Sequence, residues 1–152
     1  MAPKSAALLP FRYNGDKLEV FMVHPGGPFW ARKDDGAWSL PKGEYGDDED
    51  PLIAAQREFT EETGFVAAGP FIALGSVKMK SGKVVVAWAF EGDYAASTLR
   101  SNTFVLEWPP KSGMMKEFPE VDRGAWFSIK DAVHKLNGAQ REFLAALASR
   151  IG

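Results

Sequence analysis

Apolar residues near the start of the chain fall into two short runs, which predict a β-hairpin. Residues 6–13 (AALLPFRY) and 17–24 (KLEVFMVH) are strand-like, and Asn14-Gly15 between them is a strong turn signal. The segment that follows, residues 24–50, is rich in Gly, Pro and Asp and contains two tryptophans. A long irregular segment inside a compact domain is usually functional, so we expect this loop to contribute to a binding site.

The hydrophobic pattern next predicts a well-defined helix. A stripe of residues that would face the core recurs at helical spacing: Leu52, Ala55, Phe59 and Thr63. Asp50 is suited to cap the helix N-terminus, and Pro51 is suited to the first helical position. Gly64 follows where a residue in the left-handed conformation commonly ends a helix. We therefore expect a helix over residues 51–63.

Further strands and two helical stretches follow this helix. The strand-like segments are residues 71–79 and 83–90, joined by a turn at Ser81-Gly82, then residues 102–108 and the extended run VDRGAWFSI. The helical stretches cover residues 128–136 and 138–150. Because strands and helices mix without a repeat or a linker, the pattern predicts an α+β fold with a mixed sheet flanked by helices. We expect a single domain over residues 1–152.

Composition and charge narrow the classes of function. The formal net charge is −2, whereas a protein that grips a long nucleic acid normally has a basic surface. A small anionic substrate bound through a metal ion remains compatible with this charge. The chain has no cysteine, which excludes disulfides and thiolate metal sites. No apolar run approaches the length of a membrane span, and the N-terminus does not resemble a signal peptide, so we expect a cytoplasmic protein.

Three glutamates stand together on the predicted helix. Glu58, Glu61 and Glu62 have the i, i+3, i+4 spacing that places side chains on one helical face. Arg57, four residues before Glu61, can hold a carboxylate in a fixed orientation, and Glu49 adds an anion near the helix N-terminus. Such hard oxygen ligands suit Mg²⁺ or Mn²⁺. The competing interpretation is a glutamate-rich face that is simply solvated.

The spacing across residues 43–65, GEYGDDEDPLIAAQREFTEETGF, resembles the Nudix box. The family pattern is Gly, five residues, Glu, seven residues, and then Arg-Glu-hydrophobic-any-Glu-Glu-any-Gly-hydrophobic. Every defined position is filled, by Gly43, Glu49, Arg57, Glu58, Phe59, Glu61, Glu62, Gly64 and Phe65. The preceding residues, from Trp38 to Gly43 (WSLPKG), are similar to the lead-in that often precedes the box. The resemblance implies an α/β/α sandwich that hydrolyses a nucleoside diphosphate linked to another moiety, X, with divalent cations.

The resemblance also implies roles for individual residues. Glu58, Glu61 and Glu62 would be the main metal ligands, with the carbonyl of Gly43 as an addition. Arg57 would orient these glutamates, with Glu49 in support. The general base is either a box glutamate or a carboxylate from a later loop, where the sequence offers Glu117 and Glu120. We favour Glu120, because the spacing from Glu120 to Trp126 is similar to a run in Nudix enzymes whose glutamate reaches the metal centre. An exposed loop acid is the alternative.

Substrate recognition is expected from the long loop. Phe29 and Trp30 could stack on a base, although a place in the core is as good an interpretation for each tryptophan of the loop. We assign Trp38 to the core. Lys33 and Lys42 could contact phosphates, and Lys42, beside the box, is the better candidate.

The resemblance leaves the substrate and the assembly open. The motifs around the box are similar to the branch with bacterial predicted NTP pyrophosphohydrolases and asymmetric diadenosine tetraphosphate hydrolases. A nucleoside triphosphate or a dinucleoside polyphosphate is therefore the expected substrate, and a nucleic-acid polymer or a membrane is not an expected partner. Two alternatives are a non-catalytic nucleotide sensor and a scaffold with a structural acidic helix. A monomer and a homodimer are both compatible with the sequence.

Overall fold

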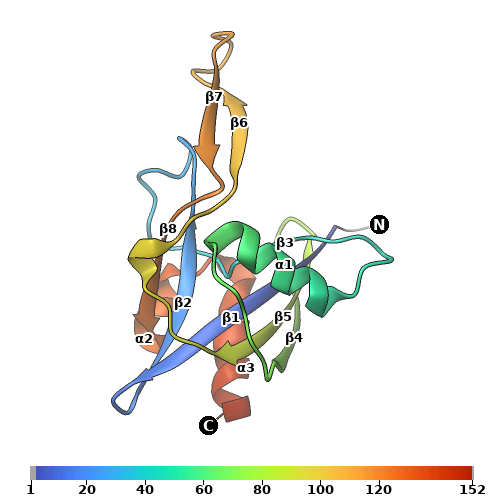
Figure 1. Ribbon diagram of the computed structural model, residues 1–152, viewed down its shortest axis with the longest axis vertical. Coiled ribbons are helices and arrows are strands. Elements are labelled where there is room, and N and C mark those ends of the chain that lie inside the picture. Colours follow the sequence, from blue (N-terminus) through green and yellow to red (C-terminus); the bar gives the residue numbers. More distant parts are fainter. Residues whose placement is uncertain (1–2, 152) are drawn as a thin grey trace.

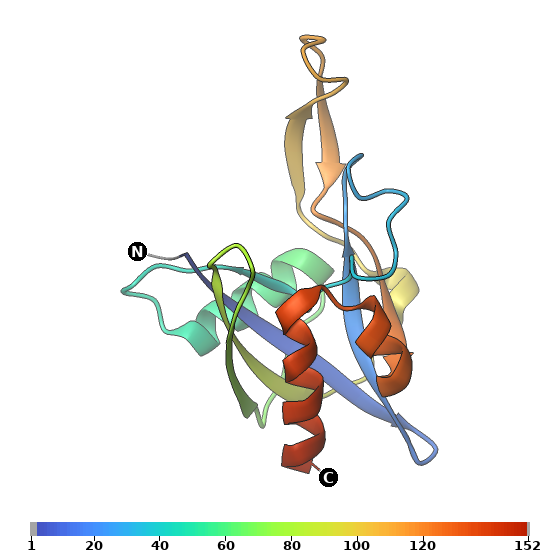
Figure 2. The same ribbon diagram turned by 180° about the vertical axis from the view of Figure 1, so that it is seen from behind.

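A computed structural model describes residues 3–151 and shows a mixed sheet with helices on both faces (Figures 1 and 2). The sheet has the strand order β4-β5-β1-β2-β8, and a short strand β3 also pairs with β1. Strand β1 pairs in parallel with β5, and the other pairings in this sheet are antiparallel. The strands are β1 (Lys4–Asn14), β2 (Lys17–Pro25), β3 (Lys42–Glu44), β4 (Ile72–Lys78), β5 (Val84–Glu91) and β8 (Val121–Ser128).

The two faces of strand β1 build two different cores. Ala7, Leu9 and Phe11 point to the face covered by α2 (Ile129–Lys135) and α3 (Glu142–Ile151). Ala6 and Leu8 point to the opposite face, where they pack with residues of α1 (Pro51–Thr63). This alternation follows from the two-residue period of a strand. The result is a sandwich of helix, sheet and helix, as expected from the sequence (Figures 1 and 2).

The local signals in the first half of the chain are confirmed. The β1–β2 turn contains Gly15 at a φ of 66°, a left-handed conformation that glycine adopts without steric cost. The side chain of Asp50 accepts a hydrogen bond from the backbone N–H of Ile53 at 3.0 Å, and it caps α1. Gly64 ends the helix at a φ of 78°. The helix therefore begins and ends where its sequence predicts.

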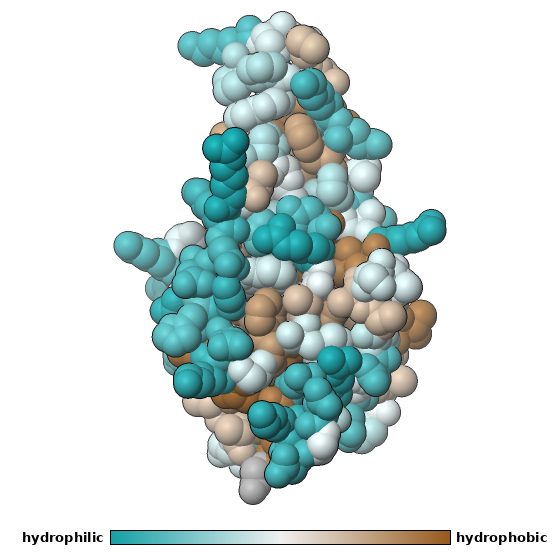
Figure 3. Space-filling model, turned by 90° about the vertical axis from the view of Figure 1, so that its left-hand side faces the viewer, coloured by the Kyte–Doolittle hydropathy of each residue, from teal (hydrophilic) through white to brown (hydrophobic). Residues whose placement is uncertain are grey.

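The region after α1 contains a second, two-stranded sheet that the sequence did not predict. The strand expected at 102–108 is β6 (Thr103–Glu107), and it pairs only with β7 (Met115–Pro119). This β6–β7 hairpin projects away from the sandwich (Figure 1), and hydrophobic side chains lie among hydrophilic ones on its surface (Figure 3). A 3-10 helix, Gly138–Arg141, also precedes α3, so the last predicted helix is interrupted near its start. Within residues 3–151, no helix has both the length and the apolar character needed to cross a membrane.

Candidate active site

Strand β3 and helix α1 hold the first and central residues of the box in contact. Gly43 is paired with Ala6 of the central strand, so its backbone is fixed by the sheet. A Cβ atom added to Gly43 would collide with the side chain of Glu58. Any other residue at this position would force the carboxylate of Glu58 to move, so glycine lets Glu58 lie directly against strand β3.

Arg57 lies at the centre of the charged face of α1. Its guanidinium is 2.8 Å from a carboxylate oxygen of Glu58 and 3.1 Å from one of Glu49. A third carboxylate, that of Glu61, is 3.5 Å away with the i, i+4 spacing. Arg57 therefore lies within reach of all three carboxylates, and its role in orienting them stays a prediction.

Glu62 is the most strongly perturbed carboxyl of the group. The pKa of Glu62 is raised to about 8, chiefly by burial; the amide and ammonium of Lys42 oppose the shift, and the nearby carboxylates of Glu120 and Glu58 add to it. One carboxylate oxygen of Glu62 accepts a hydrogen bond from the backbone N–H of Lys42 at 3.1 Å. This hydrogen bond ties the helix to strand β3. A buried carboxyl with a raised pKa beside other acids is typical of an active site or of a metal site.

Glu58 is similarly perturbed, although it also has a cationic neighbour. Burial raises the pKa of Glu58, Arg57 lowers it, and the carboxylates of Glu61 and Glu120 raise it again. Only 13% of the Glu58 side chain is exposed, compared with 39% for Glu61. The acids of α1 therefore differ: Glu58 and Glu62 lie against the protein, and Glu61 is open to solvent.

Glu120 reaches this group from the base of the β6–β7 hairpin. Its backbone N–H donates to the carbonyl of Asn102 at 2.8 Å, and its carbonyl accepts from the N–H of Gly26 at 2.9 Å. These bonds connect the hairpin to the long loop. Glu117, the other candidate base, lies on β7 opposite Val105 and is exposed. Of the two acids, the structure brings Glu120 to the box.

A cavity of about 120 Å³, which we call the carboxylate cavity, lies between β2, the box and the hairpin base. Glu62, Glu120 and Lys42 line it together with Pro25, Ser39 and other residues. Burial lowers the pKa of Lys42, and the charge of Lys83 lowers it further, against the opposing carboxylates. Within residues 3–151, the ammonium of Lys42 is in no ion pair. A cation without a partner at the wall of an acidic cavity is suited to bind an anionic ligand.

The four predicted substrate-binding residues, Phe29, Trp30, Lys33 and Lys42, lie in different surroundings. Lys42 and Trp30 line a second cavity of about 260 Å³ next to the carboxylate cavity, which we call the adjoining cavity. The ammonium of Lys33 lies over the ring of Trp30, 5.0 Å from its centroid. Phe29 is 60% exposed and packs edge-on against Trp108 of the hairpin, with 5.2 Å between the ring centroids. The structure thus places Phe29 outside the lining of both cavities.

His24 and Trp38 are buried side chains that hold this loop through hydrogen bonds. The ring of His24 is buried, with Nδ1 2.9 Å from a carboxylate oxygen of Asp122 and Nε2 2.6 Å from the carbonyl oxygen of Lys33. Trp38 is buried as expected, and its indole N–H donates to Asp34 at 2.8 Å. Sequence reasoning did not identify His24 as a residue that orders the loop, because no motif marks its two partners and Asp122 lies far along the chain.

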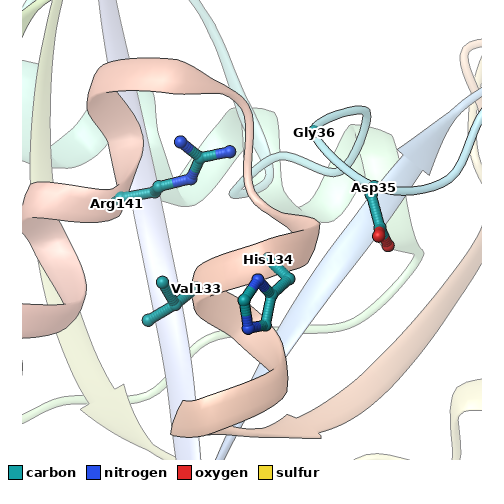
Figure 4. Close-up of a pocket in the computed structure, with 5 residues that line it drawn as sticks. All are labelled: Asp35, Gly36, Val133, His134 and Arg141. Carbon is teal, nitrogen blue, oxygen red and sulfur yellow. The ribbon is translucent and has the colours of Figure 1, made fainter.

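A further surface depression lies elsewhere. It has a volume of about 380 Å³ and is lined by Asp35, Gly36, Val133, His134 and Arg141. Figure 4 shows that these side chains come from the long loop, from α2 and from the segment before α3. None of the five belongs to the box, so this depression is separate from the carboxylates of α1.

The carboxylates of the box fit a divalent metal ion by their chemistry. Glu58 and Glu62 supply hard oxygen atoms, and both have pKa values raised by burial and by neighbouring acids, a repulsion that a cation would relieve. Within residues 3–151, however, no three acidic or imidazole side chains are already gathered in a metal-binding arrangement. The carboxylates that could bind a metal ion are therefore present, but within residues 3–151 their oxygen atoms are not gathered around one point.

The sequence model of the NUDIX domain matches residues 2–147. The chain belongs to the Nudix family. A curated relative, Nudix hydrolase 25 of Arabidopsis thaliana, is 58% identical over 33 residues, which are 22% of this chain. The aligned segment is only 19% of the length of that relative. Membership of the Nudix family confirms the resemblance drawn from residues 43–65.

Two solved structures resemble this protein in fold. The NUDIX domain of Shewanella oneidensis NrtR, solved with ADP ribose, has a TM-score of 0.71 at 18% identity and covers 100% of this chain and 90% of its own. The Ap4A hydrolase of C. elegans, solved as a binary complex, has a TM-score of 0.67 at 18% identity, with coverage of 99% and 98%. At this identity the similarity shows the Nudix fold alone.

Proposed function

We propose that this Nudix protein is a Mg²⁺- or Mn²⁺-dependent pyrophosphohydrolase of a nucleoside diphosphate linked to X. A nucleoside triphosphate or a dinucleoside polyphosphate is the substrate that we favour. The observation that carries the proposal is the meeting of the half-buried Glu62 and Glu58 with the exposed Glu120, beside the ammonium of Lys42, which is in no ion pair within residues 3–151. An acidic group and a cation at one cavity match a substrate with a phosphate chain and a bound metal ion.

Each residue of the site has a task in this reaction. Lys42 binds a phosphate oxygen, and Arg57 holds Glu58 and Glu61 in the orientation in which their oxygens can ligate an ion. Glu58, Glu61 and Glu62 would hold the ion with the carbonyl of Gly43. A bound Mg²⁺ or Mn²⁺ would neutralise phosphate oxygens and lower the pKa of the attacking water.

Glu120 is our candidate for the general base. Its place at the hairpin base lets it share the carboxylate cavity with Glu62 while its side chain remains exposed to solvent. A carboxylate in that position can accept the proton of a water molecule that enters from solvent. The remaining catalysis is positioning and electrostatic stabilisation of the phosphoryl group.

The test is a substrate screen with and without the metal ion. We expect phosphate-containing products from nucleoside triphosphates or dinucleoside polyphosphates in Mg²⁺, and no products in excess EDTA. Glu61→Gln should lower the rate by orders of magnitude without unfolding the protein, because Glu61 is exposed at the helix surface. Full activity in EDTA, or in the Glu61→Gln protein, would contradict the proposal.

A nucleotide sensor is the second candidate. The similar NUDIX domain of NrtR was solved with ADP ribose, which is the observation in favour of a binding function. The complete set of box glutamates in this chain favours catalysis instead. Tight binding of a nucleotide by calorimetry, without turnover across the whole screen, would reverse this order. In either case we propose a small nucleotide ligand and a cytoplasmic location for a single domain.

A further inference from the structure

The adjoining cavity borders the carboxylate cavity. The two cavities share Pro25, Ser39 and Lys42 in their walls. Lys42 is thus the charged side chain at the boundary, with acidic residues on one side and none on the other. A phosphate chain bound at Lys42 would have its metal-binding part among the glutamates. The rest of the substrate would then extend into the adjoining cavity.

We propose that the adjoining cavity binds the nucleobase of the substrate, and that Asn137 forms hydrogen bonds with the edge of that base. This inference rests on the proposed function, since it assigns one end of the proposed substrate. It adds a specificity-determining residue outside the box and outside the long loop. Asn137 lies in the connection between α2 and the 3-10 helix before α3.

The charges around the adjoining cavity favour a nucleotide. Its lining contains two cationic side chains, Lys42 and Lys83, and no carboxylate. Lys83 is already 3.2 Å from the carboxylate of Glu44, whereas Lys42 has no ion-pair partner in the part of the chain that the structure describes, residues 3–151. One free cation matches a single phosphate group at the mouth of the cavity. A ring that carries several phosphates would require more cations, because each phosphate has to be neutralised when it leaves water.

The shape and the remaining lining favour a flat, partly apolar group. Trp30 offers an aromatic ring, and Pro25 and Met79 offer apolar surface. Aromatic side chains and thioethers pack well against a planar heterocycle, and stacking on an aromatic ring favours binding of a base. A nucleobase fits these surfaces, whereas a bare sugar would leave the apolar residues without a partner.

Two side-chain amides line the adjoining cavity, and only one is available for a ligand. The carbonyl oxygen of Gln140 accepts from the backbone N–H of Leu40 at 2.9 Å, and its amide nitrogen donates to Ser39 at 3.2 Å. Asn137 donates its backbone N–H to the carbonyl of Trp38 at 2.8 Å, and its side chain caps no helix N–H. Its amide offers one donor and one acceptor side by side, the pair that reads a base edge.

The experiment compares substrates with and without a base in the Asn137→Ala and Trp30→Leu proteins. We expect kcat/KM for nucleoside triphosphates to fall about tenfold or more in each, mainly through KM. Hydrolysis of inorganic triphosphate, which has no base, should be unchanged. Asn14→Ala is the matched control, since Asn14 is an exposed asparagine in the β1–β2 turn. This control should leave both activities at the wild-type level.

The outcomes separate this inference from the proposed function. Equal losses with inorganic triphosphate, or no loss with any nucleotide, would overturn the assignment of the base pocket. If the wild-type protein hydrolyses nothing, the proposed function fails, and calorimetry with AMP, GMP, CMP and UMP still tests the pocket. Weaker binding of a nucleotide by Asn137→Ala than by Asn14→Ala would support the inference there. Equal affinities of the two variants would overturn it.

Discussion

Helix α1 and the β6–β7 hairpin bring carboxylates to the same cavity, but the rest of the protein holds them differently. Helix α1 is capped at both ends and buries Ala54, Ala55, Phe59 and Thr63. The hairpin strands pair only with each other, and their contacts with the long loop include Phe104 beside Gly27 and Trp108 against Phe29. Figure 1 shows the consequence: the helix lies on the sheet, while the hairpin extends beyond it.

The difference separates the two tasks of the site. Glu58 and Glu62 belong to a helix whose position is fixed by the core, so their carboxyl groups are held in place before any ligand binds. Glu120 belongs to the base of a hairpin with few anchors, and we infer that it adjusts more easily when substrate and metal enter. Rigid elements preorganise a site, whereas loosely packed ones supply the motion that closes it.

Truncation of a core side chain of α1 should have the largest effect and should show most clearly that the helix is held more firmly than the hairpin. Phe59→Ala removes a fully buried ring that packs edge-on against Phe90, with 5.6 Å between the centroids. We expect the free energy of unfolding to fall by about 3 to 5 kcal/mol, as measured by urea denaturation. The same measurement on Val105→Ala, at a hairpin position that is 61% exposed, should show a change within about 0.5 kcal/mol. Similar losses in both would show that the hairpin is as firmly held as the helix.

Neutralising the buried helix carboxylate should remove activity but not stability. Glu62→Gln deletes a charge that burial disfavours, so we expect no loss of unfolding free energy in EDTA. The rate of pyrophosphate hydrolysis should fall about a thousandfold, because the variant removes a proposed ion ligand. Glu142→Gln, at an exposed position of α3, is the control and should keep full activity. A Glu62→Gln protein with normal turnover would remove Glu62 from the site.

The hairpin carboxylate should have a smaller effect. If Glu120 is the base, Glu120→Gln should lower kcat by about a hundredfold and flatten the acidic limb of the pH–rate profile. Glu117→Gln provides the matched control, since Glu117 is an exposed acid three residues earlier on β7. Equal effects of the two substitutions would mean that neither acid is the base, and that the hairpin acts on the site only through its shape.

The charge of Glu62 should also appear in the pH dependence of stability. Its pKa is about 8 in the folded protein, whereas an unfolded glutamate titrates near about 4.3. Between these values the folded state holds a proton that the unfolded chain has lost. The contribution of Glu62 is therefore fully present below about pH 4.3 and is lost as the pH rises through about 8.

Urea denaturation in EDTA at several pH values measures this contribution. The unfolding free energy of the wild-type protein should decrease relative to that of Glu62→Gln as the pH rises from about 5.5 to about 9. Added Mg²⁺ should oppose the decrease in the wild-type protein, because an ion that binds only the folded state stabilises it. Parallel curves for the two proteins would show that Glu62 titrates normally.

The sequence predicted the helix side of this site better than the hairpin side. The caps of α1, its buried stripe and the spacing of its acids all depend on residues close in sequence, and they agree with the structure. Strand β7 was missed because its run, MKEFP, lacks regular alternation, and because its only partner, β6, lies across a turn rich in Pro and Gly. The two loop aromatics, Phe29 and Trp30, look alike in sequence. Phe29 packs against the hairpin and Trp30 lines the adjoining cavity, and no local sequence pattern predicts this difference.

The parallel pairing of β1 with β5 has a consequence for the order in which the protein folds. The β1–β2 hairpin closes locally, at Asn14 and Lys17, whereas Leu8 finds Trp88 only after α1 and β4 have been made. Distant pairings of this kind form slowly, because a long loop must close before any contact compensates its entropy. On the ribosome the box is therefore synthesised well before Glu120 and strand β8. Because Glu120 directly precedes β8, it can join the carboxylates of α1 only once β8 has been made and has paired with β2.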